Sequence, residues 1–113
     1  MSLAGKKELY LLPVIATSHG CGKKKVLLGA GETESAITQI AVTQLKAGES
    51  VEEHRHPTME ECFFIRKGRV RIVIGTDSDV FAEDSFIRIP KNAGHSMEAL
   101  TDCEMLTVGC ACE

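Results

Sequence analysis

Residues 54–68, HRHPTMEECFFIRKG, decide the expected fold because they place two imidazoles and a pair of carboxylates within two extended runs. Side chains alternate faces along a strand, so His54 and His56 point the same way and can hold one ion. A proline and a threonine follow them and favour a turn. The run CFFI then suits a second strand, which returns a carboxylate to the histidines.

The same alternation chooses between the two adjacent glutamates. Glu61 shares its strand face with Phe63 and Ile65, whereas Glu60 shares the opposite face with residues that include Arg66. The all-apolar face is the expected interior, so Glu61 is predicted to lie beside the histidines. Glu60 is predicted to lie behind the ligands or at the surface, and it is the candidate catalytic residue that moves a proton.

Segment 35–46, SAITQIAVTQLK, precedes this region and is dense in β-branched residues that alternate with polar ones. This pattern predicts a long strand. An amphipathic helix is the alternative, because apolar residues also recur at Ile37, Ile40, Ala41 and Leu45. The β-branching and the strand patterns downstream favour the strand.

Short extended runs separated by turn residues fill the rest of the chain. Downstream, strands are expected at 69–74, 80–82, 86–89, 95–100 and 104–112. Upstream, 25–28 reads as a short strand, and 8–16 reads as an edge strand or strand-like arm because Pro13 interrupts it. Close, regular spacing of this kind predicts an all-β sandwich or barrel with a mouth.

Composition narrows the function classes. The 113 residues carry a formal net charge of −3, with 43% hydrophobic and only 4% aromatic residues, which fits one domain and makes nucleic acid an unexpected partner. Lys23, Lys24 and Lys25 form the one basic cluster, which is interpreted as a solvated strand end. Without a membrane span or a signal segment, we expect a cytoplasmic protein and no membrane partner. Residues 1–3 are interpreted as an expression remnant and given no role.

The five cysteines are an odd number, which favours reduced thiols over a disulfide framework. Cys62 is expected to pack in a strand, and Cys110 and Cys112 share one face near the C-terminus without a second pair at zinc-finger spacing. Cys21 lies in a glycine-flanked turn beside His19. No role follows for Cys21, Cys110 or Cys112, and His19 is interpreted as a turn residue that could line the mouth.

The spacing of these residues resembles the cupin family, in particular small single-domain cupins, and loosely those of polysaccharide and sugar metabolism. The family's first motif is G-x5-H-x-H, three or four residues, E-x6-G, and this chain matches it in full with Gly48, His54, His56, Glu61 and Gly68. The second motif, G-x5-P-x-G-x2-H-x3-N, is matched in part. Pro90 and His95 are in place, whereas Asp84 and Asn92 stand at the two glycine positions and Ala99 at the asparagine. Asparagine at the second glycine is a mild change, because it tolerates the left-handed conformation.

The resemblance implies a small double-stranded β-helix, the cupin or jelly-roll barrel. Residues 1–34 are expected to form an N-terminal arm and edge strands, and 35–113 the barrel core of a single domain. The resemblance also implies a metal site of His54, His56, Glu61 and His95. Imidazole and carboxylate ligands suit iron, manganese, nickel, cobalt or zinc. The alternative is that these are ordinary polar strand residues, but three of the four histidines fall on motif positions.

The expected cavity wall comprises Met59, Phe63, Met97 and Arg88. Met97 is two residues from His95 on the same strand face, whereas Arg88 would anchor an anion only if its face turned inward. Ile87 and Ile89 beside it favour the outward orientation.

Three functions remain open. The first is a metal-dependent isomerase or epimerase that acts on a polar metabolite such as a sugar derivative. The second is a non-haem iron dioxygenase. The third is a cupin that binds a small ligand such as a sugar without catalysis. A homodimer is expected from the resemblance and from the apolar arm.

Overall fold

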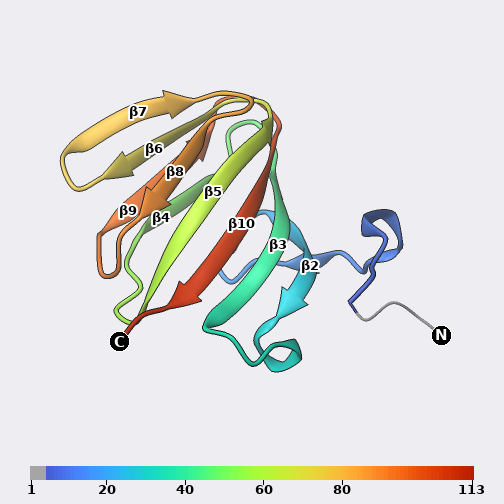
Figure 1. Ribbon diagram of the computed structural model, residues 1–113. Coiled ribbons are helices and arrows are strands. Elements are labelled where there is room, and N and C mark those ends of the chain that lie inside the picture. Colours follow the sequence, from blue (N-terminus) through green and yellow to red (C-terminus); the bar gives the residue numbers. More distant parts are fainter. Residues whose placement is uncertain (1–4) are drawn as a thin grey trace.

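The computed structural model describes residues 5–113. This part of the chain forms two antiparallel β-sheets that face one another in a small jelly-roll barrel, which confirms the predicted all-β fold (Figure 1). Residues 1–3, interpreted as an expression remnant, lie outside the described range. Within that range no helix is long and apolar enough to cross a membrane.

The larger sheet has six strands in the order β1-β2-β3-β10-β5-β8. Their bounds are β1 Ile15–Ala16, β2 Lys23–Gly29, β3 Ile37–Leu45, β10 Cys103–Ala111, β5 Met59–Lys67 and β8 Phe86–Ile89. Segment 35–46 is therefore a strand, as predicted, and its helical alternative is wrong. The C-terminal strand β10 lies in the sheet between β3 and β5, so long-range pairing holds the sheet together.

The smaller sheet has four strands in the order β4-β9-β6-β7. Their bounds are β4 Ser50–His54, β9 His95–Ala99, β6 Val70–Ile74 and β7 Asp77–Phe81. The strands predicted at 69–74 and 80–82 correspond to β6 and β7, which pair with each other as a hairpin, and β7 begins earlier than the sequence suggested.

The core lies between the inward faces of the two sheets. Ile65 on β5 pairs in register with Met105 on β10, and both side chains are fully buried. Ile72 of the smaller sheet and Ile89 of β8 belong to the same apolar cluster. This apolar cluster is the close-packed core of the barrel, and the polar residues described below line a cavity beside it.

Several turn positions have a left-handed backbone, among them three positions of the two motifs. Gly68 has a φ of 81°, and a Cβ there would collide with the Asp102 carbonyl oxygen, so only glycine fits. Asp84 and Asn92 occupy the two glycine positions of the second motif, with φ values of 68° and 63°. The motif's backbone geometry is therefore kept where its glycines are not, since Asp and Asn tolerate this conformation better than most residues.

The prediction of a strand-like arm over residues 8–16 is wrong for most of its length. Leu9–Leu11 forms a 3-10 helix, η1, and only the two residues of β1 pair with β2. The backbone N–H groups of Leu11 and Leu12 donate to the carbonyls of Glu8 and Leu9, which diverts the chain from extended pairing. A second 3-10 helix, η2 (Ala30–Glu32), forms the connection from β2 to β3.

Candidate metal centre

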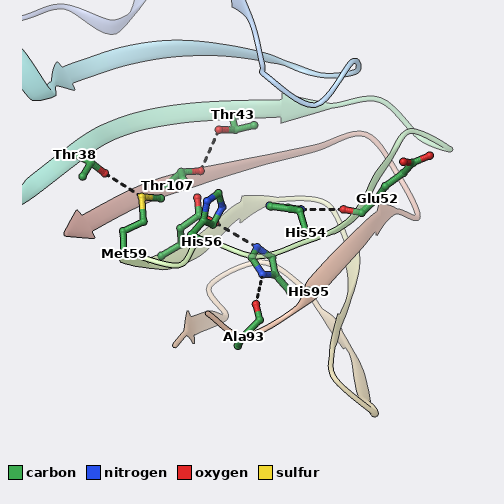
Figure 2. Close-up of polar contacts among 10 residues, drawn as sticks. Thr38, Thr43, Glu52, His54, His56, Met59, Ala93, His95 and Thr107 are labelled. Carbon is green, nitrogen blue, oxygen red and sulfur yellow. Dashed lines mark hydrogen bonds and ion pairs between the residues drawn. The ribbon is translucent and has the colours of Figure 1, made fainter. Parts of the chain in front are cut away.

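Four side chains with metal-binding atoms meet near one end of the barrel. His54 ends β4 and pairs in register with His95, which begins β9. His56 follows in the loop after β4, and Glu61 comes across from β5 in the other sheet. Figure 2 shows the three imidazoles gathered in one place. Both sheets therefore contribute to the cluster, which we call the His/Glu cluster.

The potential ligand atoms are close together. One ligand atom from each of the four residues lies within 4.8 Å of all the others. Glu61 Oε1 is 3.0 Å from His56 Nε2 and 3.3 Å from His95 Nε2. The His54 ring lies 4.2 Å, centroid to centroid, from the His95 ring. Distances of this size allow one ion to contact all four residues.

Two backbone carbonyls determine where the ring protons lie. His95 Nδ1 is 2.9 Å from the Ala93 carbonyl oxygen, and His54 Nδ1 is 2.9 Å from that of Glu52 (Figure 2). A carbonyl oxygen only accepts hydrogen bonds, so each Nδ1 donates and each Nε2 of a neutral ring keeps its lone pair. Such outer contacts commonly orient metal-binding histidines.

The Nε2 atoms of His56 and His95 are buried and make no hydrogen bond. Each lies close to Glu61, but the arrangement lacks the alignment of a hydrogen bond, so two unpaired ring nitrogens and a carboxylate oxygen converge on shared space. Unsatisfied buried acceptors are costly. A cation in that space would satisfy them together, so the residues present fit a divalent metal ion.

The electrostatics of the cluster follow from this proximity. Burial raises the pKa of the Glu61 carboxyl, but the His95 contact and the neighbouring histidines outweigh it and leave the pKa below its usual value. Burial lowers the pKa of His95, but the Glu61 carboxylate and the Ala93 carbonyl outweigh it and raise the pKa above its usual value. Burial and the neighbouring imidazoles lower the pKa of His54 despite the Glu52 carbonyl. The carboxylate is therefore held ionised.

A cavity of about 170 Å³ opens beside the cluster. Three of the four predicted wall residues line it: Met59, Phe63 and Met97. Met59 is held by a contact of 3.5 Å between its Sδ and Thr38 Oγ1, which Figure 2 shows. Gly109 on β10 leaves room for this pair, because a Cβ there would collide with Thr38.

Glu60 and Arg88 lie elsewhere. Neither lines the cavity, and they pair with each other, with Arg88 Nη1 2.9 Å from Glu60 Oε2. Arg88 is paired in register with Cys62 on β5, so it shares the sheet face opposite to that of Glu61 and Phe63. The structure therefore gives Glu60 no contact with the His/Glu cluster, and it gives Arg88 no place in the cavity wall.

The sequence interpretation allowed His19 a place at the mouth of the barrel but missed other cavity residues. The ring of His19 lies 4.4 Å from that of His54, and burial together with His54 lowers the pKa of His19. Lys24, Gln39 and Thr43 line the opposite wall. Lys24 is the middle one of three lysines on a strand, so its side chain lies on the opposite face of the sheet from those of its two neighbours. This alternation could have placed Lys24 in the interior. All five cysteines are free thiols, as predicted.

Comparison with known proteins identifies the family. The family model described as the Cupin domain matches residues 41–109. No curated protein matches the chain in sequence.

Solved structures with the same fold cover nearly the whole chain. A Thermotoga maritima protein described as a predicted oxalate decarboxylase is 20% identical, with a TM-score of 0.82 over 92% of this chain and 96% of its own. Ectoine synthase from P. lautus is 15% identical, with a TM-score of 0.82 over 96% and 78%. KdgF from a Halomonas species is 9% identical, with a TM-score of 0.70 over 86% and 85%. At these identities the likeness shows the fold alone.

Proposed function

The chain belongs to the cupin family, and on that premise we propose that it binds one divalent transition metal ion through His54, His56, Glu61 and His95. The carrying observation is the convergence of four ligand atoms within 4.8 Å, two of them buried without a hydrogen bond. Three imidazoles and a carboxylate suit iron, manganese, nickel, cobalt or zinc.

We further propose that the cavity beside this site is where a small polar metabolite such as a sugar derivative is isomerised or epimerised. A divalent ion there would polarise a carbonyl or hydroxyl oxygen of the metabolite. Met59, Phe63 and Met97 would supply an apolar wall that limits the water around the reacting atoms. The volume of about 170 Å³ restricts the portion of a ligand that can enter.

Proton transfer needs a side chain that reaches the cavity. Glu60 pairs with Arg88 and does not line the cavity, so it lacks the reach that a general base requires. His19 lines the cavity and contacts no carboxylate at ion-pair distance among the described residues. Its lowered pKa keeps the ring neutral and able to accept a proton near pH 7. His19 therefore takes the proton-carrying role in this proposal.

Non-catalytic binding of a small ligand is the second candidate. It is favoured by the absence of any carboxylate other than Glu61 from the cavity lining within residues 5–113. Enzymes that move protons on carbon often need a second titratable group.

Turnover assays on metal-loaded protein separate these functions. Conversion of sugar phosphates or nucleotide sugars, reduced by His19→Gln with metal content unchanged, supports the isomerase or epimerase. Stoichiometric metal with ligand binding but no turnover supports the binding protein. Oxygen consumption that requires iron would instead identify a dioxygenase and contradict both.

We also propose a cytoplasmic homodimer. The dimer is supported by the apolar N-terminal segment, in which Tyr10, Leu11 and Val14 are 75%, 69% and 55% exposed. A second copy would cover these side chains. Light scattering that returns the mass of a single chain contradicts the dimer.

A further inference from the structure

One cation faces the cavity from the wall formed by β2 and β3. Lys24 on β2 is paired in register with Thr43 on β3, and both residues line the cavity, as do three members of the His/Glu cluster: His54, His56 and Glu61. Thr43 in turn shares a 3.0 Å hydrogen bond with Thr107 of β10, as Figure 2 shows. The lysine therefore belongs to the inner wall of the barrel, unlike a solvated strand end.

Lys24 has a neutral partner. Its Nζ donates to Gln39 Oε1 at 2.6 Å, and it takes part in none of the ion pairs found among residues 5–113. An ammonium group carries three N–H donors, so the bond to Gln39 fixes its position and leaves donors for a ligand. Burying half of a charged side chain without a carboxylate partner costs free energy. An anionic ligand in the cavity would offset this cost by pairing with the Lys24 ammonium.

The charges that face the cavity are unbalanced. Glu61 is the only carboxylate among the described residues that line it, and Lys24 is the only lysine or arginine. A divalent ion held by neutral histidines and one carboxylate keeps a surplus of positive charge, to which Lys24 adds. The field inside the cavity therefore favours an anion.

The geometry points to Lys24 as the residue that selects a carboxylate-bearing substrate. The substrate class is a small hydroxy acid: a hydroxyl or carbonyl oxygen lies toward the metal, and the carboxylate pairs with the Lys24 ammonium. This inference rests on the proposed metal site and narrows its substrate from polar metabolites in general to acidic ones. A cavity of about 170 Å³ holds about six water molecules at about 30 Å³ each. Acids of two to four carbons match that space.

The test uses the full chain loaded with cobalt(II), whose visible spectrum reports ligands that enter the metal's coordination sphere. Glycolate, glycerate and threonate are titrated calorimetrically against their neutral counterparts ethylene glycol, glycerol and threitol. The proteins are the wild type, Lys24→Gln, Lys24→Arg and the matched control Lys23→Gln. Lys23 is the exposed neighbour on the same strand and does not line the cavity.

We expect at least one acid to bind the wild type about 10- to 100-fold more tightly than its polyol, the range expected for a charged hydrogen bond. Lys24→Gln should lose this preference, Lys24→Arg should restore part of it, and Lys23→Gln should keep it, with equal cobalt content throughout. No preference for any acid in the wild type, or equal preference in Lys24→Gln, overturns the inference while leaving the metal site intact. Failure of the wild type to hold cobalt overturns the metal site and the inference together.

Discussion

Two adjacent glutamates with different environments set the chemistry of the site. Glu61 faces the barrel interior with Phe63, whereas Glu60 faces outward and pairs with Arg88 at 2.9 Å. The one-residue offset is enough to separate them, because strand side chains alternate. The pair therefore offers a test in which the same chemical change is made on either side of one strand.

Glu61→Gln should weaken metal binding by more than about 100-fold, since loss of an outer partner alone costs about 10- to 100-fold. Glu60→Gln removes the same charge from the far face and should leave affinity within about twofold. Competition with a chromophoric chelator measures both. Equal affinities in the two variants would rule out Glu61 as a ligand.

Protons should compete with the metal at His95. The pKa of His95 is raised above its ordinary value of 6.5, because Glu61 and the Ala93 carbonyl outweigh the effect of burial. Only the neutral ring binds a metal, so below that raised pKa each bound ion displaces a proton, and affinity should increase as the pH rises through it. Above it, the dependence should level off. Calorimetric titrations in buffers of different ionisation enthalpy measure the released protons, and affinity that does not change from about pH 6 to about pH 8 would contradict this assignment.

At the scale of elements, β10 connects the core to the site. Its alternate residues Cys103, Met105 and Thr107 are buried, and the strand pairs with β3 on one side and β5 on the other. The six-stranded sheet is therefore continuous only when β10 has paired with both β3 and β5.

Met105→Ala should lower the free energy of unfolding by about 2 to 5 kcal/mol, because it removes a fully buried apolar side chain and leaves a void in its place. The side chain is 0% exposed and pairs across to Ile65. Leu106→Ala is the matched control on the half-buried outer face, where a cost of about 1 kcal/mol is expected. Urea denaturation measures both, and equal losses would show that the inner face is not the main core.

The loop between β8 and β9 supports the His/Glu cluster through its backbone. Asn92 N–H donates to the His56 carbonyl oxygen at 2.8 Å while Asn92 itself holds a φ of 63°. Asn92→Ala should destabilise the fold by about 1 to 2 kcal/mol, because a Cβ without a compensating polar group disfavours this conformation. Asn92→Gly should be close to neutral. Thermal unfolding compares them, and an alanine variant as stable as the glycine variant would contradict the account.

At the scale of the whole molecule, the sequence predicts features that follow from local residue patterns better than features that depend on packing between distant segments. The strands and the grouping of His54, His56 and Glu61 follow from alternation and spacing, and the third histidine, His95, was placed through the family resemblance. Most of the arm departs from an extended course because hydrogen bonds between near neighbours form the 3-10 helix η1, which the apolar pattern of residues 8–16 does not reveal. The position of Lys24 in the cavity wall depends on pairing with β3, a contact that propensity does not encode, so the sequence alone predicts a solvated strand end.

The central claim is that the His/Glu cluster holds a metal ion, and elemental analysis tests it most directly. The wild type and the His54→Ala and His56→Ala variants are purified without a metal-affinity column and compared by plasma mass spectrometry, with circular dichroism to verify the fold. The account predicts about one divalent transition metal ion per wild-type chain, and loss of that ion from both folded variants. Unchanged metal content in the variants, or a wild type that takes up none of the five candidate metals when supplied with them, would contradict it.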